Sequence, residues 1–111
     1  MTHSYLGVFD QLEPPSDLEL PLQALWWLKK GRLEVGDEWE RAHEICQTAE
    51  GEKPFDWVHA LVHLIEGDLA NANYWYRRAG ELQIGVHAAQ EWDHLARKLG
   101  GDISSGKEPE T

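Results

Sequence analysis

Residues 59–80, "HALVHLIEGDLANANYWYRRAG", have the pattern of two short helices separated by a glycine. Before Gly67, apolar residues recur three and four positions apart, which places them on one face of a helix. After Gly67, a second face of small and apolar residues is formed by Ala72, Trp75, Ala79 and Leu82, with Tyr76 beside it. Glycine ends helices readily because it adopts positive φ. We therefore expect an antiparallel helical hairpin here, with packing roles for Trp75 and Tyr76.

Similar helix signals recur along the rest of the chain. Pro21 can open a first helix that Gly31 closes, Asp37 can cap a second that runs to about Ala49, and Asp56 can cap the third. A fifth helix is expected within residues 85–100. No segment of comparable length alternates with period two. The sequence predicts an all-α fold of about five short helices: two antiparallel hairpins and a C-terminal closing helix.

One helical domain is expected over residues 20–100. The chain has 111 residues, which suits a single core. Residues 1–19 contain the pair Pro14 and Pro15 and are expected to form an extended arm, which apolar residues could dock on the domain: Tyr5, Leu6, Val8, Phe9 and Leu12. Residues 101–111 are small and polar, so we expect a flexible tail.

Charge and cysteine content bear on the partners and the compartment. The formal net charge is −10, which disfavours nucleic acid and anionic membrane surfaces as partners. Cys46 is the single cysteine, so an internal disulfide is excluded and a reducing compartment is favoured. The N-terminus lacks a signal-peptide pattern, and no apolar run is long enough to span a membrane. We expect a cytoplasmic protein.

A repeat relates the two expected hairpins. The first helix of each shares a spaced pattern: Ala24, Leu25, Leu28 and Gly31 recur 36 positions later as Ala60, Leu61, Leu64 and Gly67. In such a hairpin, small residues allow close approach of the helices, glycine ends one of them, and an aromatic ring fills a groove. Repeats of this kind need their end faces covered, by the arm, the fifth helix or a second subunit, so a homodimer is plausible.

These positions resemble a known repeat class. The small, turn and ring positions of a tetratricopeptide hairpin are matched by Ala60, Gly67, Ala72, Tyr76 and Ala79, and "NANYWYRRAG" at 71–80 resembles the Ala-x-x-Trp-Tyr-x-x-Ala helix of Sel1-like repeats. With "WERAHE" at 39–44, the wider pattern is similar to a family of small bacterial proteins, a likeness that implies a fold and no chemistry.

Histidines next to carboxylates are the other feature of the chain. His59 and His63 lie at i and i+4 on one helix, with Glu66 one turn further, so these three residues could hold a divalent metal. They could equally be core histidines with hydrogen-bond partners. Two Glu-x-x-His pairs have the spacing of di-iron bundles, Glu40 with His43 and Glu91 with His94.

We expect a small acidic module without a cofactor that binds a protein or peptide, with a basic segment as the favoured partner. Its expected groove is lined by His43, Gln47, His59, His63, Glu66, Tyr74 and Arg77. The chain lacks glycine-rich phosphate loops and nucleophile elbows, which favours a binding role over an enzymatic one. The alternative is a small metal-binding protein or enzyme that uses a His/Glu cluster between the second and third helices.

Overall fold

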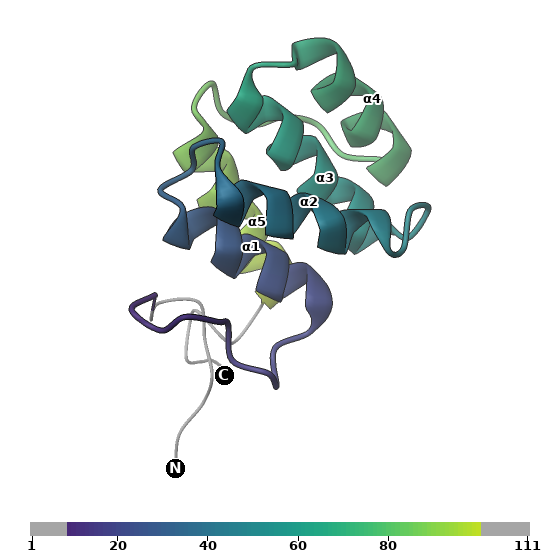
Figure 1. Ribbon diagram of the computed structural model, residues 1–111. Coiled ribbons are helices and arrows are strands. Elements are labelled where there is room, and N and C mark those ends of the chain that lie inside the picture. Colours follow the sequence, from purple (N-terminus) through teal and green to yellow (C-terminus); the bar gives the residue numbers. More distant parts are fainter. Residues whose placement is uncertain (1–8, 101–111) are drawn as a thin grey trace, which may run out of the picture.

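The computed structural model describes residues 9–100, and this part of the chain contains five helices (Figure 1). They are α1 (Leu20–Lys30), α2 (Asp37–Gln47), α3 (Lys53–Glu66), α4 (Leu69–Ala79) and α5 (Ala88–Gly100). Residues 9–100 contain no strand, and the expectation of an all-α fold with about five short helices is confirmed. None of these helices is long and apolar enough to cross a membrane. The expected tail at 101–111 lies outside the described residues.

Helices that follow one another in the chain pack together in pairs, and the fifth helix packs against both pairs. α1 packs against α2 and α3 against α4, while α5 contacts α1 and α3 (Figure 1). The Trp92 indole N–H of α5 donates to the Leu25 carbonyl of α1 at 2.7 Å, in the buried interior. α2 and α3 are also in contact, and this contact joins the two pairs.

The turn between α3 and α4 follows from residues already visible in the sequence. Gly67 has φ 85°, a left-handed conformation that glycine adopts without steric cost, and it ends α3. Asp68 then caps α4 by accepting from the Asn71 backbone N–H. Gly80 ends α4 in the same left-handed way, at φ 72°. The expectation that Leu82 shares the packing face was wrong, because the chain leaves the helix at Gly80 and Leu82 is 81% exposed.

Two expected helix caps were also wrong. α3 begins at Lys53, with Pro54 in its first turn, and Asp56 is already inside the helix. The buried Asp56 carboxylate instead accepts from the Gly51 backbone N–H at 3.0 and 3.2 Å, so it holds the preceding turn against the helix. Gly36 is the N-cap of α2, and Asp37 is the first residue of the helix. There the negative charge of Asp37 interacts favourably with the positive end of the helix dipole.

The described part of the N-terminal segment contacts the core. Phe9 packs on Trp26 and Trp92, with ring centroids 5.9 and 6.3 Å apart, and its carbonyl accepts from Lys30 Nζ at 3.0 Å. Phe9 therefore docks, as one of the expected residues, whereas Leu12 is exposed. Tyr5, Leu6 and Val8 lie outside the described residues.

A buried carboxylate fixes the loop between α4 and α5. Glu91 is fully buried and accepts from the Tyr76 hydroxyl at 2.6 Å and from the Ile84 and Gly85 backbone N–H groups at 2.7 Å each. Burial, together with the hydrogen bond to Glu91, raises the pKa of Tyr76. Glu91 therefore has a structural role, and it belongs to neither group of possible metal ligands in residues 9–100.

Candidate metal centre

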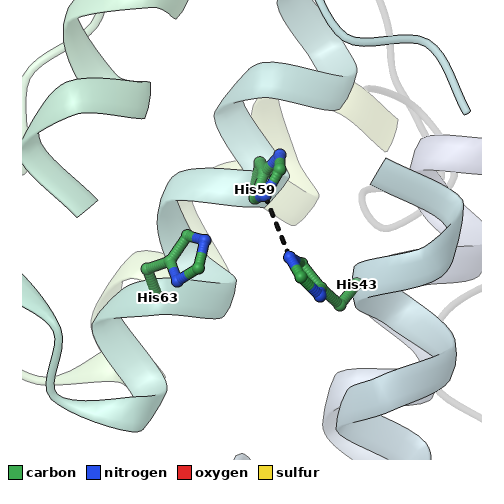
Figure 2. A group of neighbouring side chains, drawn as sticks. All are labelled: His43, His59 and His63. Carbon is green, nitrogen blue, oxygen red and sulfur yellow. Dashed lines mark hydrogen bonds between the residues drawn. The ribbon is translucent and has the colours of Figure 1, made fainter. Parts of the chain in front are cut away.

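Three imidazoles meet where α2 packs against α3. His43 comes from α2, and His59 and His63 come from α3 (Figure 2). His43 Nε2 and His59 Nε2 are 3.2 Å apart, and one ligand atom from each of the three histidines lies within 4.8 Å of the other two. The ring centroids are 4.9 Å apart for His43 and His59, and 5.3 Å apart for His43 and His63. The expected convergence of these three histidines is what the structure contains.

Helical spacing and one buried hydrogen bond place these rings together. His59 and His63 are four residues apart, so both side chains lie on the face of α3 that meets α2. The Trp39 indole N–H of α2 donates to the Val62 carbonyl of α3 at 2.9 Å, which fixes the two helices side by side. His43 lies one turn after Trp39 and therefore points at the same face of α3.

Aromatic rings cover two sides of the cluster. Trp75 of α4 stacks on His59 with a centroid distance of 3.9 Å and an interplanar angle of 13°. The Trp39 ring lies 5.2 Å from His43. Sequence reasoning placed Trp75 in the core without linking it to the histidines. The signal was available: His59 and Trp75 are each eight positions from Gly67, and equidistant residues face each other across an antiparallel turn.

Glu66 orients His63 and does not join the three-histidine group. His63 Nδ1 and Glu66 Oε2 are 2.6 Å apart, so the ionised carboxylate accepts a proton held on Nδ1. The Nε2 atom of a neutral His63 is then free of hydrogen and can act as a ligand. A carboxylate on the second nitrogen of a histidine is the usual support for a metal ligand. Glu66 and Asp68 form a separate group with the buried His63, in which Glu66 is exposed and Asp68 is partly buried.

The environment keeps two of the imidazoles neutral. Burial, followed by the neighbouring His43 and His63, lowers the pKa of His59 from 6.5 to about 3. Burial, followed by His63, also lowers the pKa of His43, although Glu40, Glu66 and Glu50 act in the opposite direction. Metal binding requires an unprotonated ring nitrogen. Both rings are therefore neutral at neutral pH. Because their Nε2 atoms share one hydrogen bond, one Nε2 carries a proton that must move to Nδ1 before both nitrogens can bind a metal.

His59 carries an unsatisfied polar atom. Its side chain is 2% exposed, and its Nδ1 is one of two buried side-chain nitrogens in residues 9–100 without a hydrogen-bond partner. Leaving such an atom unpaired costs roughly 1–3 kcal/mol. His59 has a hydrogen-bond partner in His43 through Nε2, as the core-histidine alternative expects, while its Nδ1 is unpaired. A buried polar group retained at such a cost calls for a further role.

The remaining residues of the expected groove lie on the surface. Gln47, Tyr74 and Arg77 are exposed, and the Tyr74 hydroxyl accepts from Arg78 Nη1 at 3.0 Å. Tyr74 is connected to the cluster indirectly, since its ring contacts Trp75 at 5.1 Å. Cys46 is buried, which raises the pKa of its thiol, and it belongs to neither group of possible ligands.

Comparisons of the chain with protein-family models, with curated proteins and with solved structures gave no match. The resemblance to tetratricopeptide and Sel1-like hairpins therefore stays a prediction. The function has to be argued from the geometry of the histidines and from the exposed surface.

Proposed function

We propose that the protein binds one divalent transition metal ion between α2 and α3, through His43, His59 and His63. The observation that carries this proposal is the meeting of three imidazole ligand atoms within 4.8 Å. A tetrahedral Zn²⁺ with Zn–N bonds of about 2.05 Å needs nitrogens ~3.3 Å apart. The 3.2 Å between His43 Nε2 and His59 Nε2 already matches this spacing. The remaining adjustment is at most ~1.5 Å, which rotation of side chains can supply.

The donor set indicates the class of metal. Neutral imidazoles suit Zn²⁺, Cu²⁺, Ni²⁺ and Co²⁺, whereas Mg²⁺ and Ca²⁺ prefer carboxylate and carbonyl oxygens. The three histidines contribute no negative charge. Glu66 supports the site through His63 Nδ1 and sharpens the donor geometry. We propose Zn²⁺ as the ion that this set fits best, since three histidines are an established zinc ligand set.

Charge around the site favours a cation. Glu40, Glu50 and Glu66 lie close enough to favour positive charge at His43. The whole chain has a formal charge of −10. A negative surface raises the local concentration of cations and speeds their arrival.

A bound ion would connect the two hairpins. His43 belongs to the α1–α2 pair, while His59 and His63 belong to the α3–α4 pair. An ion that binds the folded state alone stabilises it by about 2.7 kcal/mol when its free concentration is one hundred times its Kd. Metal binding would therefore raise the thermal midpoint as well as fill the site.

The test is elemental analysis of natively purified, untagged protein, followed by Zn²⁺ titration against a competing chelator. We expect one equivalent per chain in the wild type and loss of the bound ion in His43→Ala and in the double variant His59→Ala/His63→Ala. The matched control is His87→Ala, because His87 is exposed and outside both ligand groups. Circular dichroism of each variant separates loss of metal from loss of fold.

Two results would reject the proposal. One is a folded wild-type protein that binds none of Zn²⁺, Cu²⁺, Ni²⁺ or Co²⁺ more tightly than the double variant does. The other is metal binding that survives in every folded variant of the three histidines, because the ion would then be held elsewhere.

Partner binding is a second candidate, and a specific surface feature favours it. Leu82, Ile84 and Val86 alternate along the loop before α5 and are 81%, 59% and 79% exposed. Rows of exposed apolar side chains are typical of protein contacts. A peptide with apolar residues could pack on this row, and basic residues in the same peptide would complement the acidic charge of the chain. Binding of such a peptide that is lost in Leu82→Ser/Ile84→Ser/Val86→Ser and kept in His43→Ala would support this candidate. Partner binding would then be a function separate from metal binding.

A further inference from the structure

Among residues 9–100, three side chains supply possible ligand atoms at the histidine cluster. His43, His59 and His63 form one group, and the carboxylates of Glu66 and Asp68 form another, which shares only His63. A tetrahedral metal needs a fourth ligand. We propose that the fourth position of the bound metal is open to solvent, so that a small anion can replace the water there. This inference rests on the proposed function.

Glu66 is the carboxylate that is hydrogen-bonded to a histidine of the cluster, and its geometry keeps it away from the fourth position. It is bound to Nδ1 of His63 at 2.6 Å. The metal would be held by the opposite nitrogen, Nε2, of the same ring. One carboxylate oxygen cannot hold the Nδ1 proton and coordinate an ion across the imidazole. Glu66 is therefore a positioning residue, and it leaves the metal with one exchangeable position.

The burial pattern sets the size of the ligand that can enter. His59 is 2% and His63 8% exposed, whereas His43 is only half-buried. Access is therefore from the His43 side. Trp75 stacked on His59 and Trp39 beside His43 cover other sides of the cluster. Restricted access of this kind favours a small ligand over a bulky one.

Charge at the site favours an anion in that position. Three neutral imidazoles leave a dication with its full charge, which becomes the largest charge in the pocket. The carboxylates of Glu40, Glu50 and Glu66 oppose an anion, but all three residues are exposed, where solvent screens their repulsion. Metal centres with three protein ligands and one exchangeable position are typical of catalytic zinc sites, whereas structural sites are closed.

The experiment uses Co²⁺ in place of Zn²⁺, because Zn²⁺ is spectroscopically silent, and sodium azide as the small anion. The full-length protein is loaded with one equivalent of Co²⁺, and its visible d–d spectrum is recorded during azide titration. We expect a saturable shift of these bands in the wild type. The same shift should occur in Glu44→Gln. Glu44→Gln is a matched charge control, since Glu44 is exposed on α2 and belongs to neither ligand group.

Glu66→Gln separates the open site from a closed one. We expect it to bind Co²⁺ more weakly, while its azide response stays like that of the wild type once it is saturated with metal. An azide response that appears only in Glu66→Gln would overturn the inference, because Glu66 would then be the fourth ligand. Bound Co²⁺ that ignores azide in both proteins would also overturn it. Failure of the wild type to bind Co²⁺, Zn²⁺, Cu²⁺ or Ni²⁺ would instead overturn the proposed function.

Discussion

Acidification should destabilise the metal-free protein through His59. Its pKa falls from an ordinary 6.5 to about 3 in the folded state, since burial disfavours the charged ring. As pH falls below 6.5, the unfolded chain takes up a proton that the folded chain refuses, so the stability present at neutral pH is progressively lost. At pH 5 the difference is about 1.5 pH units at ~1.36 kcal/mol each, a loss of about 2 kcal/mol. His43, whose pKa is also lowered, adds to the loss in the same direction.

Urea denaturation at pH 7 and pH 5 in the presence of a chelator measures this loss. His59→Phe is the informative variant, because it keeps a flat ring against Trp75 and removes the titrating group. His43 is hydrogen-bonded to His59 and coupled to it, so the difference between the two pH-dependent losses reports His59 together with its effect on His43. We expect the wild type to lose about 2 kcal/mol more than the variant. Equal losses in the two proteins would refute the reasoning, because His59 would then be protonated as easily in the fold as in the unfolded chain.

Three further predictions concern Glu66, Glu91 and the exposed apolar residues before α5. Glu66→Gln should weaken Zn²⁺ binding roughly 10- to 100-fold, measured by chelator competition, because His63 loses its charged support; unchanged affinity would contradict its positioning role. Glu91→Ala should lower the free energy of unfolding by at least about 3 kcal/mol, since it leaves three donors without a partner. A loss below ~1 kcal/mol in urea denaturation would show that water replaces the carboxylate. Leu82→Ser/Ile84→Ser/Val86→Ser should change stability by less than ~0.5 kcal/mol, because these side chains are exposed; a larger loss would mean that they are packed.

The α3–α4 hairpin was predictable because its turn is coded locally. Gly67 and Gly80 both adopt the left-handed conformation that the sequence pattern required, and apolar spacing fixed the faces between them. The errors occurred where a local signal had a tertiary alternative. Asp56 is a residue type that often caps helices, but its carboxylate accepts a hydrogen bond from the Gly51 backbone N–H. The helix has already started at Lys53, with Pro54 in its first turn. Leu82 continues the helical period beyond the glycine that ends the helix.

Two of the three histidines were predictable from spacing alone, whereas the expected position of His43 beside them depends on packing. His59 and His63 share a face by the i, i+4 rule alone. His43 joins them only because the hydrogen bond from Trp39 to Val62 sets how α2 lies on α3, and one sequence does not specify this contact. Glu66 contacts Nδ1 of His63 through an i, i+3 contact within α3, which the spacing of the two residues allows without any tertiary packing.

We propose that three histidines of this protein hold one metal ion. X-ray absorption at the zinc edge of the stoichiometrically loaded protein tests it most directly, because outer-shell scattering counts imidazole ligands. We predict a first shell of four nitrogen or oxygen atoms at about 2.0–2.1 Å, with outer-shell scattering from three imidazoles. A shell dominated by carboxylate oxygens, or one imidazole or none, would contradict the account.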